Sequence, residues 1–209
     1  MEQSADYEVP TTARREPTQK RSRERVERIL AVSTELIGEQ GSDALRMSDV
    51  AQKAGISIGS LYQYFPDKGA IVTALAERIH AESRTCIAEG LENVTTLEDF
   101  HEAFAELIKI YYGMFLSEPV MRDVWSGMQA DRNLRAVELA QSRINGELLA
   151  SVLQRLRPSA DSAVLGAKAF LVMQLGEATM RLAVSVPRDE GDRLVETYTR
   201  MALRELEAE

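Results

Sequence analysis

The chain has 209 residues, with 25 Lys or Arg against 33 Asp or Glu, which gives a net charge of −8 at pH 7. A single cysteine excludes a disulfide framework within one chain, and two histidines argue against a Cys/His zinc site. No stretch has the apolar length of a signal peptide or of a membrane-spanning helix, which predicts a cytoplasmic protein without a membrane partner.

Residues 1–17 are expected to form a disordered tail, because they contain few large apolar residues and two prolines. Basic side chains gather around its end, since the segment Arg14–Arg28 holds seven basic against three acidic residues. Most of the net negative charge lies beyond residue 68. A polyanion would therefore meet the N-terminal part of the chain.

Apolar residues recur at spacings of three and four almost throughout, which predicts helices and no strands. A first helix runs from about residue 18 to Gly41, a residue type that commonly ends helices. Ser57 and Asp67 are the expected N-caps of two later helices, which Pro66 separates. The other helices are expected at 48–54, 57–65, 67–91, 96–117, 120–129, 134–156, 161–186 and 189–207.

These elements predict an all-α fold of about nine helices without internal repeats. Residues 18–66 form a small N-terminal three-helix domain, and residues 67–209 form a larger C-terminal helical bundle.

The two short helices at 48–54 and 57–65 predict a helix-turn-helix, a motif whose second helix enters the DNA major groove. Gly55 supplies the positive φ that the turn between them needs. Leu61 and Phe65 lie four residues apart and are expected to face the core. The other side of this helix carries hydroxyls and one Gln amide but no charge, which suits contact with phosphates and base edges.

The run Ile-Ser-Ile-Gly-Ser-Leu-Tyr-Gln-Tyr-Phe-Pro-Asp-Lys at residues 56–68 resembles the recognition helix of the TetR/AcrR family of transcriptional regulators. The segment Met-Ser-Asp-Val-Ala-Gln-Lys-Ala-Gly before it extends the resemblance, which covers about residues 20–75. The resemblance implies an all-α homodimer. It also implies an N-terminal DNA-binding domain and a divergent C-terminal domain for dimerisation and ligand binding.

The resemblance places DNA contacts on the recognition helix and its flanks. Ser60 and Gln63 are the candidates for base contacts, and Tyr62 and Tyr64 for phosphate contacts. Arg46 stands where the family usually has Thr, so a guanidinium replaces the usual hydroxyl there. The full expected set is Lys20, Arg21, Arg23, Arg46, Ser57, Ile58, Gly59, Ser60, Tyr62, Gln63, Tyr64 and Lys68.

Half of the chain's aromatic residues and three methionines fall within residues 100–128. They form either ordinary core or the lining of an adaptable apolar pocket. Polar residues nearby would fix a ligand in such a pocket or lie at a surface or interface, and Glu177 can also pair with Arg181. The candidate pocket residues are His101, Phe104, Tyr111, Tyr112, Phe115, Met121, Trp125, Met128, Gln174 and Glu177.

The segment 161–186 is too apolar to lie alone on a surface. Together with 189–207 it is expected to pack against its copy in a second subunit. The candidate interface residues are Phe170, Met173, Leu194, Tyr198 and Met201.

The favoured hypothesis is a repressor that binds a palindromic double-stranded operator as a homodimer and is released by a small apolar or aromatic effector. The alternative is a DNA-binding protein whose C-terminal domain is a protein-interaction platform without a ligand. An enzyme is not expected, because the sequence lacks a phosphate-binding glycine loop, a nucleophile elbow and metal-ligand spacing. No catalytic residue, cofactor or metal is therefore expected.

Overall fold

The computed structural model describes residues 16–117 and 132–208, and these ranges are helical without a strand. Their helix bounds lie within a few residues of those expected from the sequence, whereas the helix expected at 120–129 lies outside the described residues. Over the same ranges, no helix combines the length and apolar character needed to cross a membrane. The helices are α1 (Glu16–Gln40), α2 (Met47–Lys53), α3 (Ile58–Tyr64), α4 (Lys68–Leu91), α5 (Leu97–Ser117), α7 (Arg132–Leu156), α8 (Ser162–Ser185) and α9 (Arg188–Glu207).

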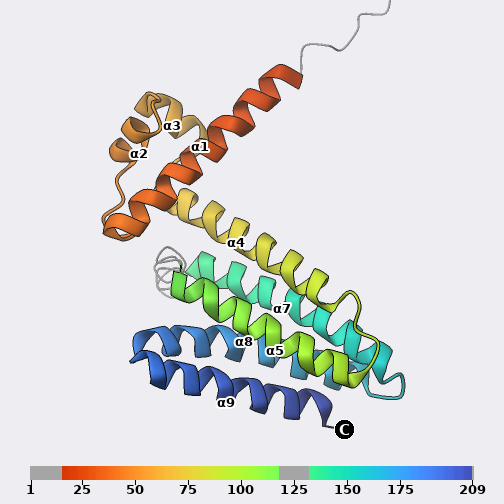
Figure 1. The fold of residues 1–209 in the computed structure, drawn as a ribbon. Coiled ribbons are helices and arrows are strands. Elements are labelled where there is room, and N and C mark those ends of the chain that lie inside the picture. Colours follow the sequence, from red (N-terminus) through yellow and green to blue (C-terminus); the bar gives the residue numbers. More distant parts are fainter. Residues whose placement is uncertain (1–15, 118–131, 209) are drawn as a thin grey trace, which may run out of the picture.

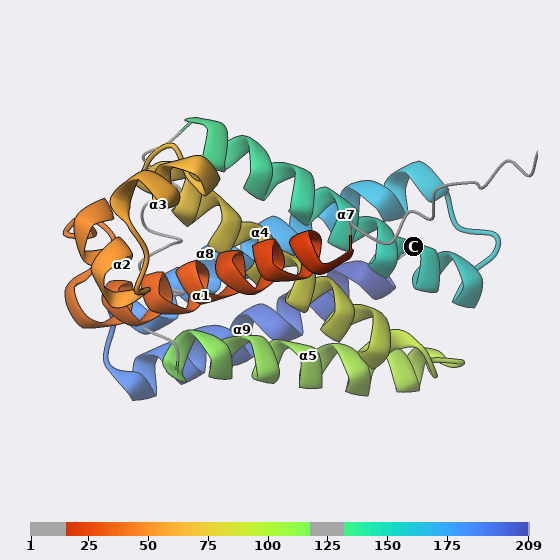
Figure 2. The same ribbon diagram turned by 90° about the horizontal axis from the view of Figure 1, so that it is seen from above.

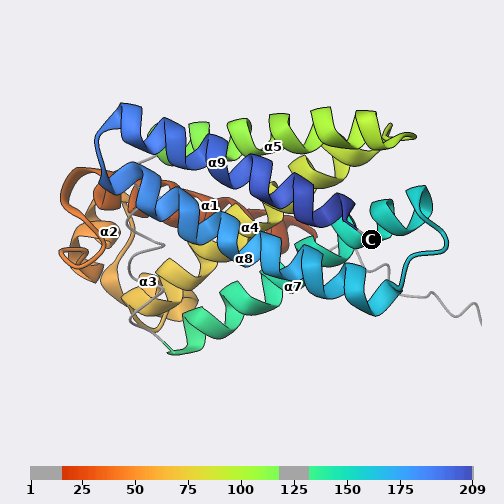
Figure 3. The same cartoon turned by 90° about the horizontal axis from the view of Figure 1, so that it is seen from below.

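The three N-terminal helices lie at one end of the molecule, and α4 leads from them into the larger bundle (Figure 1). Seen from above, α5 and α9 lie on one side of this bundle and α7 on the other (Figure 2). The face remote from α1, α2 and α3 is formed by α8 and α9, which are nearest the viewer in Figure 3. The expected all-α architecture is confirmed.

Local signals in the sequence fix the helix ends around the helix-turn-helix. The Ser57 hydroxyl accepts a hydrogen bond from the Ser60 amide at 3.1 Å, and the Asp67 carboxylate accepts one from the Ala70 amide at 2.9 Å. These are the N-caps of α3 and α4, as expected. Gly55, in the turn between α2 and α3, has φ +66°. This left-handed conformation is costly for residues that carry a Cβ.

One hydrophobic core joins the three N-terminal helices to the bundle. Ile29, Val50 and Leu61 of the first three helices are fully buried together with Ile71 of α4. Phe115 of α5 and Met180 of α8 belong to the same core. The domain boundary expected at residues 66–67 therefore falls where α4 begins, and the first half of α4 packs with both parts. A second core, farther along the bundle, includes Phe100, Leu149, Leu153, Leu165 and Leu206.

Replacing Gly55 with Ala should destabilise the protein by about 1–2 kcal/mol, because the new Cβ would be held at positive φ. No heavy atom lies within 4 Å of a Cβ built there, so backbone strain alone should set this cost. Thermal unfolding should show a Tm lowered by several degrees. The control is Gly59→Ala in α3, where the added Cβ also meets open space but φ is not positive, and it should leave the Tm unchanged or higher. Equal effects of the two substitutions would contradict this explanation.

Candidate DNA-binding face and effector cavity

Helix α3 has a buried side and an exposed side, as its sequence predicts. Leu61 is fully buried and Phe65, its C-cap, is 7% exposed. On the opposite side Tyr62 is 51% exposed and Ile58 is 44% exposed, which is unusual for large apolar side chains. Ser57, Gly59 and Gln63 are also exposed, whereas Ser60 is half-buried and Tyr64 packs partly against the core. The exposed side of α3 therefore carries hydroxyl, amide and apolar groups together.

The candidate basic contacts flank this helix. Lys20, Arg21 and Arg23 are exposed on α1. Arg46 is exposed at the N-cap of α2, and its side chain makes no capping hydrogen bond there. Lys68 opens α4 and donates a hydrogen bond to the Asp43 carbonyl at 3.0 Å. All five side chains are accessible to a polyanion.

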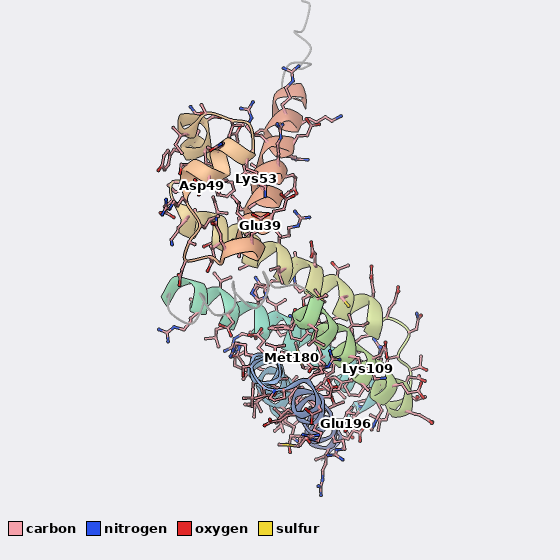
Figure 4. All side chains as sticks on the ribbon, turned by 60° about the vertical axis from the view of Figure 1, so that its left-hand side comes forward. Glu39, Asp49, Lys53, Lys109, Met180 and Glu196 are labelled. Carbon is pink, nitrogen blue, oxygen red and sulfur yellow. The ribbon has the colours of Figure 1, made fainter. Side chains whose placement is uncertain are left out.

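Ion pairs hold the helix-turn-helix against its neighbours. Lys53 of α2 lies 3.1 Å from the Glu35 carboxylate and 3.3 Å from that of Glu39, both on α1; Figure 4 shows Lys53 beside Glu39. Arg78 of α4 pairs with Glu27 of α1 at 2.9 Å. Such exposed pairs add little stability. They link α1 to α2 and to α4 at the surface.

A cavity lies among α4, α5, α7 and α8. Its described lining is mostly apolar. Several of its residues were not predicted from the sequence, because no sequence pattern distinguishes a residue that lines a cavity from one that packs in the core. Its volume is about 60 Å³, small beside the usual range for ligand sites, so a ligand would have to part the side chains around it. The lining residues are Ile79, His80, Ser83, Cys86, Ile87, Phe104, Leu107, Ile110, Tyr111, Met114, Asn145, Leu149, Met173 and Glu177.

Three of the expected pocket residues line this cavity: Phe104, Tyr111 and Glu177. Several others lie elsewhere. His101 is exposed, and its Nδ1 lies 3.3 Å from the Glu207 carboxylate of α9. Tyr112 and Phe115 are buried in the core that α4 shares with α1, α2 and α3. Gln174 is half-buried and is not among the described lining residues, and Met121, Trp125 and Met128 lie outside the described residues.

A buried polar cluster closes one side of the cavity. Glu177 of α8 is 6% exposed, and its Oε1 accepts a hydrogen bond from the Ser142 hydroxyl of α7 at 3.1 Å. Glu138 of α7 is also 6% exposed, and Arg181 of α8 lies 3.5 Å from its carboxylate. Burial, followed by hydrogen bonding to Glu138 and the negative charge of that residue, raises the pKa of Glu177 to about 9. Glu177 is therefore protonated at neutral pH.

His80 of α4 reaches the same region and is 2% exposed. Burial lowers its pKa to about 4, against the opposing effect of Glu138. The imidazole is therefore neutral at pH 7, and so is the protonated carboxyl of Glu177. Among the described residues, no group of three or more His, Cys, Asp or Glu could hold a metal ion.

The outer face of α8 carries an exposed apolar stripe. Its members lie at helical spacings of seven and four, and they are Val164, Leu171, Leu175 and Leu182, each between 47% and 54% exposed. Met201 of α9 is 64% exposed. The sequence pattern had not singled out the four α8 residues, because α8 is apolar on nearly all sides and its outer face is set only by tertiary packing.

The other residues expected at the dimer interface do not belong to this exposed stripe. Tyr198 is buried within the protomer and donates a hydrogen bond to the Val172 carbonyl at 2.6 Å. Met173 lines the cavity. Phe170 is half-buried beneath the Arg143 guanidinium, 4.4 Å from its ring centroid, and Leu194 is also half-buried. Of the five candidates, Met201 is thus the one that lies openly on the described surface.

Two parts of the chain match known protein families. Residues 29–75 match the family described as "Bacterial regulatory proteins, tetR family". Residues 98–209, more than half of the chain, match the one described as "Tetracyclin repressor-like, C-terminal domain". The first range contains the helix-turn-helix, and the second contains α7, α8, α9 and all of α5 except its first residue.

Individual proteins resemble the chain over similar ranges. It is 26% identical, over 87% of its length and 90% of the relative's, to a helix-turn-helix transcriptional regulator from the dhlA 5′ region of Xanthobacter autotrophicus. The transcriptional repressor KstR of Mycolicibacterium smegmatis is 40% identical over 32% of this chain and 36% of its own. A TetR-family regulator from Streptomyces coelicolor shares its fold with a TM-score of 0.67 and 24% identity, over 87% of this chain and 97% of that one.

The buried carboxyl should make stability fall as the pH rises. An unfolded Glu177 ionises near its ordinary pKa of 4.5, whereas the folded one holds its proton to about pH 9. The native state thus binds the extra proton, and its stabilising effect is lost progressively between these two values. Glu177→Gln should remove this dependence, so that its Tm exceeds that of the wild type by a margin that grows from about pH 5 to about pH 9.

The other polar and charged groups around Glu177 are the same in Glu177→Gln and in the wild type, so a difference in the pH dependence of their Tm values can be assigned to Glu177. Glu138 and Ser142 on α7, Arg181 on α8, Tyr198 on α9 and His80 on α4 remain in both proteins. Glu196→Gln, an exposed substitution on α9 (labelled in Figure 4), should follow the wild-type pH profile. A Tm difference between Glu177→Gln and the wild type that stays constant with pH would show that Glu177 is ionised in the native state.

Proposed function

Because this chain belongs to the TetR family of bacterial transcriptional regulators, we propose that it represses transcription by binding a palindromic operator as a homodimer. We further propose that a small, largely apolar effector releases it from DNA. The observation that carries the first proposal is the exposed, uncharged side of α3, framed by basic residues of α1, α2 and α4.

In this function α3 reads the major groove. Gln63 has the amide that pairs bidentately with adenine, and Ser60 lies one turn before it on the same helix. Tyr62, Tyr64, Lys68 and the cations of α1 hold phosphates and set the orientation of the helix. Two copies of α3, related by a two-fold axis, meet half-sites about one helical turn or more apart.

The cavity is the proposed effector site, and α4 is the proposed link to DNA. Ile79 lines the cavity near the middle of α4 and Ile87 near its end, while Ile71 and Leu75 pack near its start against the DNA-binding helices. A ligand that parts the cavity walls would move α4 and change the spacing of the two recognition helices. Only a ligand that binds one spacing more tightly can shift the equilibrium between them. The cavity favours this reading over a ligand-free interaction platform.

The exposed stripe on α8, extended by Met201 on α9, is the proposed dimer face. Contiguous apolar surface of this kind commonly marks a protein–protein interface. A two-fold axis would place the stripe against its own copy.

Selection of the purified protein against a random DNA pool, at near-physiological salt, should enrich a palindrome. Gln63→Ala should change the preferred bases, since one bidentate base contact supplies about 1–3 kcal/mol of discrimination. Lys68→Ala should weaken binding to all sequences and reduce its salt dependence. Gln40→Ala, at the exposed end of α1, is the control and should select the wild-type site. An unchanged site for Gln63→Ala would refute the base contact, and absence of any enriched palindrome would refute the proposed mode of DNA binding.

Leu175→Glu should convert the dimer to a monomer at micromolar concentration, because it buries a charge at the centre of the proposed interface. Sedimentation velocity would measure the change. Leu97→Glu is the matched control, since Leu97 is 40% exposed but lies at the start of α5, away from the stripe. A wild-type monomer, or a Leu175→Glu dimer as stable as the control, would contradict the assignment.

A further inference from the structure

We infer that the cavity takes an uncharged, largely apolar molecule whose hydroxyl group donates a hydrogen bond to the Asn145 carbonyl oxygen. This inference rests on the proposed function and names the chemical class of its effector. It follows from three features of the cavity: an apolar wall, a buried carbonyl oxygen without a partner, and a lining in which the described residues include no cation.

The wall of the cavity selects for apolar surface. Ile79 and Ile87 of α4, Phe104 and Leu107 of α5, Leu149 of α7 and Met173 of α8 all line it. Burying apolar ligand surface against such residues contributes about 25 cal/mol for each Å² removed from water. The thioethers of Met173 and Met114 are flexible enough to make room for a ligand larger than the present cavity.

The Asn145 carbonyl oxygen in this lining has no partner among the described residues. Asn145 is 4% exposed and its Oδ1 accepts no hydrogen bond, whereas Glu177 accepts one from Ser142 and is hydrogen-bonded to Glu138. Leaving a buried polar group unsatisfied costs about 1–3 kcal/mol. A ligand that supplied the missing donor would recover that cost. Because Asn145 lines the cavity, its ligand is the molecule placed to do so.

The charges around the cavity exclude an ionised ligand. A carboxylate would meet no Lys or Arg among the described lining residues, and Arg181 behind them already pairs with Glu138. An ammonium group would need ionised Glu177, but its pKa of about 9 leaves only about one molecule in a hundred ionised at pH 7. His80 is neutral there as well.

A hydroxyl group supplies the donor that this oxygen lacks. It can donate its proton to the Asn145 carbonyl oxygen beside the neutral carboxyl of Glu177. An alcohol or phenol on an apolar skeleton therefore satisfies the polar atom without carrying a charge into the cavity.

Isothermal titration calorimetry on the full-length protein would test this inference with two sets of probes. One set is cinnamyl alcohol, cinnamate and cinnamylamine, and the other is octanol, octanoate and octylamine. At pH 7 the better-binding alcohol should bind at least about tenfold more tightly than either charged probe of its set. Titration in two buffers with different ionisation enthalpies should show that the alcohol binds without net proton exchange.

Three variants separate the roles of the two polar residues. Asn145→Leu should weaken alcohol binding at least about tenfold, because it removes the acceptor. Glu177→Gln should keep the affinity within about threefold, because an amide retains a neutral donor and acceptor. Glu147→Gln, an exposed substitution on α7, is the control and should bind as the wild type does.

Tighter binding of a charged probe, proton release with an amine, or loss of alcohol binding in Glu177→Gln would each overturn the inference. Failure of all six probes would overturn it too. Enrichment of a palindromic DNA site by the same preparation would then leave the proposed DNA-binding function standing. Failure of both experiments would refute the function together with the effector class.

Discussion

The structure depends on one constraint, which is that α4 belongs to two packed regions at once. Its first half buries Ile71 and Leu75 in the core of the DNA-binding helices, and its middle forms one wall of the cavity through Ile79 and His80. A helix of 24 residues is about 36 Å long and resists bending. In the proposed mechanism, a displacement of the cavity wall would therefore reach the helix-turn-helix as a movement of the whole helix, because close-packed cores transmit strain.

The polar side of the cavity depends on close packing of α7 against α8. Glu177, Glu138 and Ser142 are buried between α7 and α8, where desolvation disfavours a second negative charge beside Glu138. Gly146 allows this closeness, since a Cβ at that position would lie 2.9 Å from the Phe170 Cα of α8. The approach of the two helices thus creates the low-dielectric environment that keeps Glu177 protonated, and with it the hydrogen-bonding character of the cavity.

The sequence predicted which side of α3 is exposed far better than which residues line the cavity, for a physical reason. Which side of α3 is buried follows from the spacing of Leu61 and Phe65 in a short helix with one apolar side, and the Ser57 cap follows from its residue type. Helix α5 has several aromatic residues, and the spacing alone could not show that Tyr111 faces the cavity while Tyr112 faces the core shared with α4. The direction of each depends on how four helices far apart in the sequence pack together.

Helix α8 shows how effector and dimer could be coupled. Met173 and Glu177 line the cavity, whereas Leu171 and Leu175, two residues before each of them, lie exposed on the outer stripe. A two-residue step in an α-helix turns through about 200°, so these pairs lie on opposite sides. In the proposed dimer one side of α8 would contact the ligand and the other the partner subunit. A ligand that shifts α8 would thus change the dimer contact directly, while α4 carries the same event to DNA. Ligand binding would thus reach the separation of the recognition helices by two routes, and the size of the shift would be set by the difference in ligand affinity between the two states.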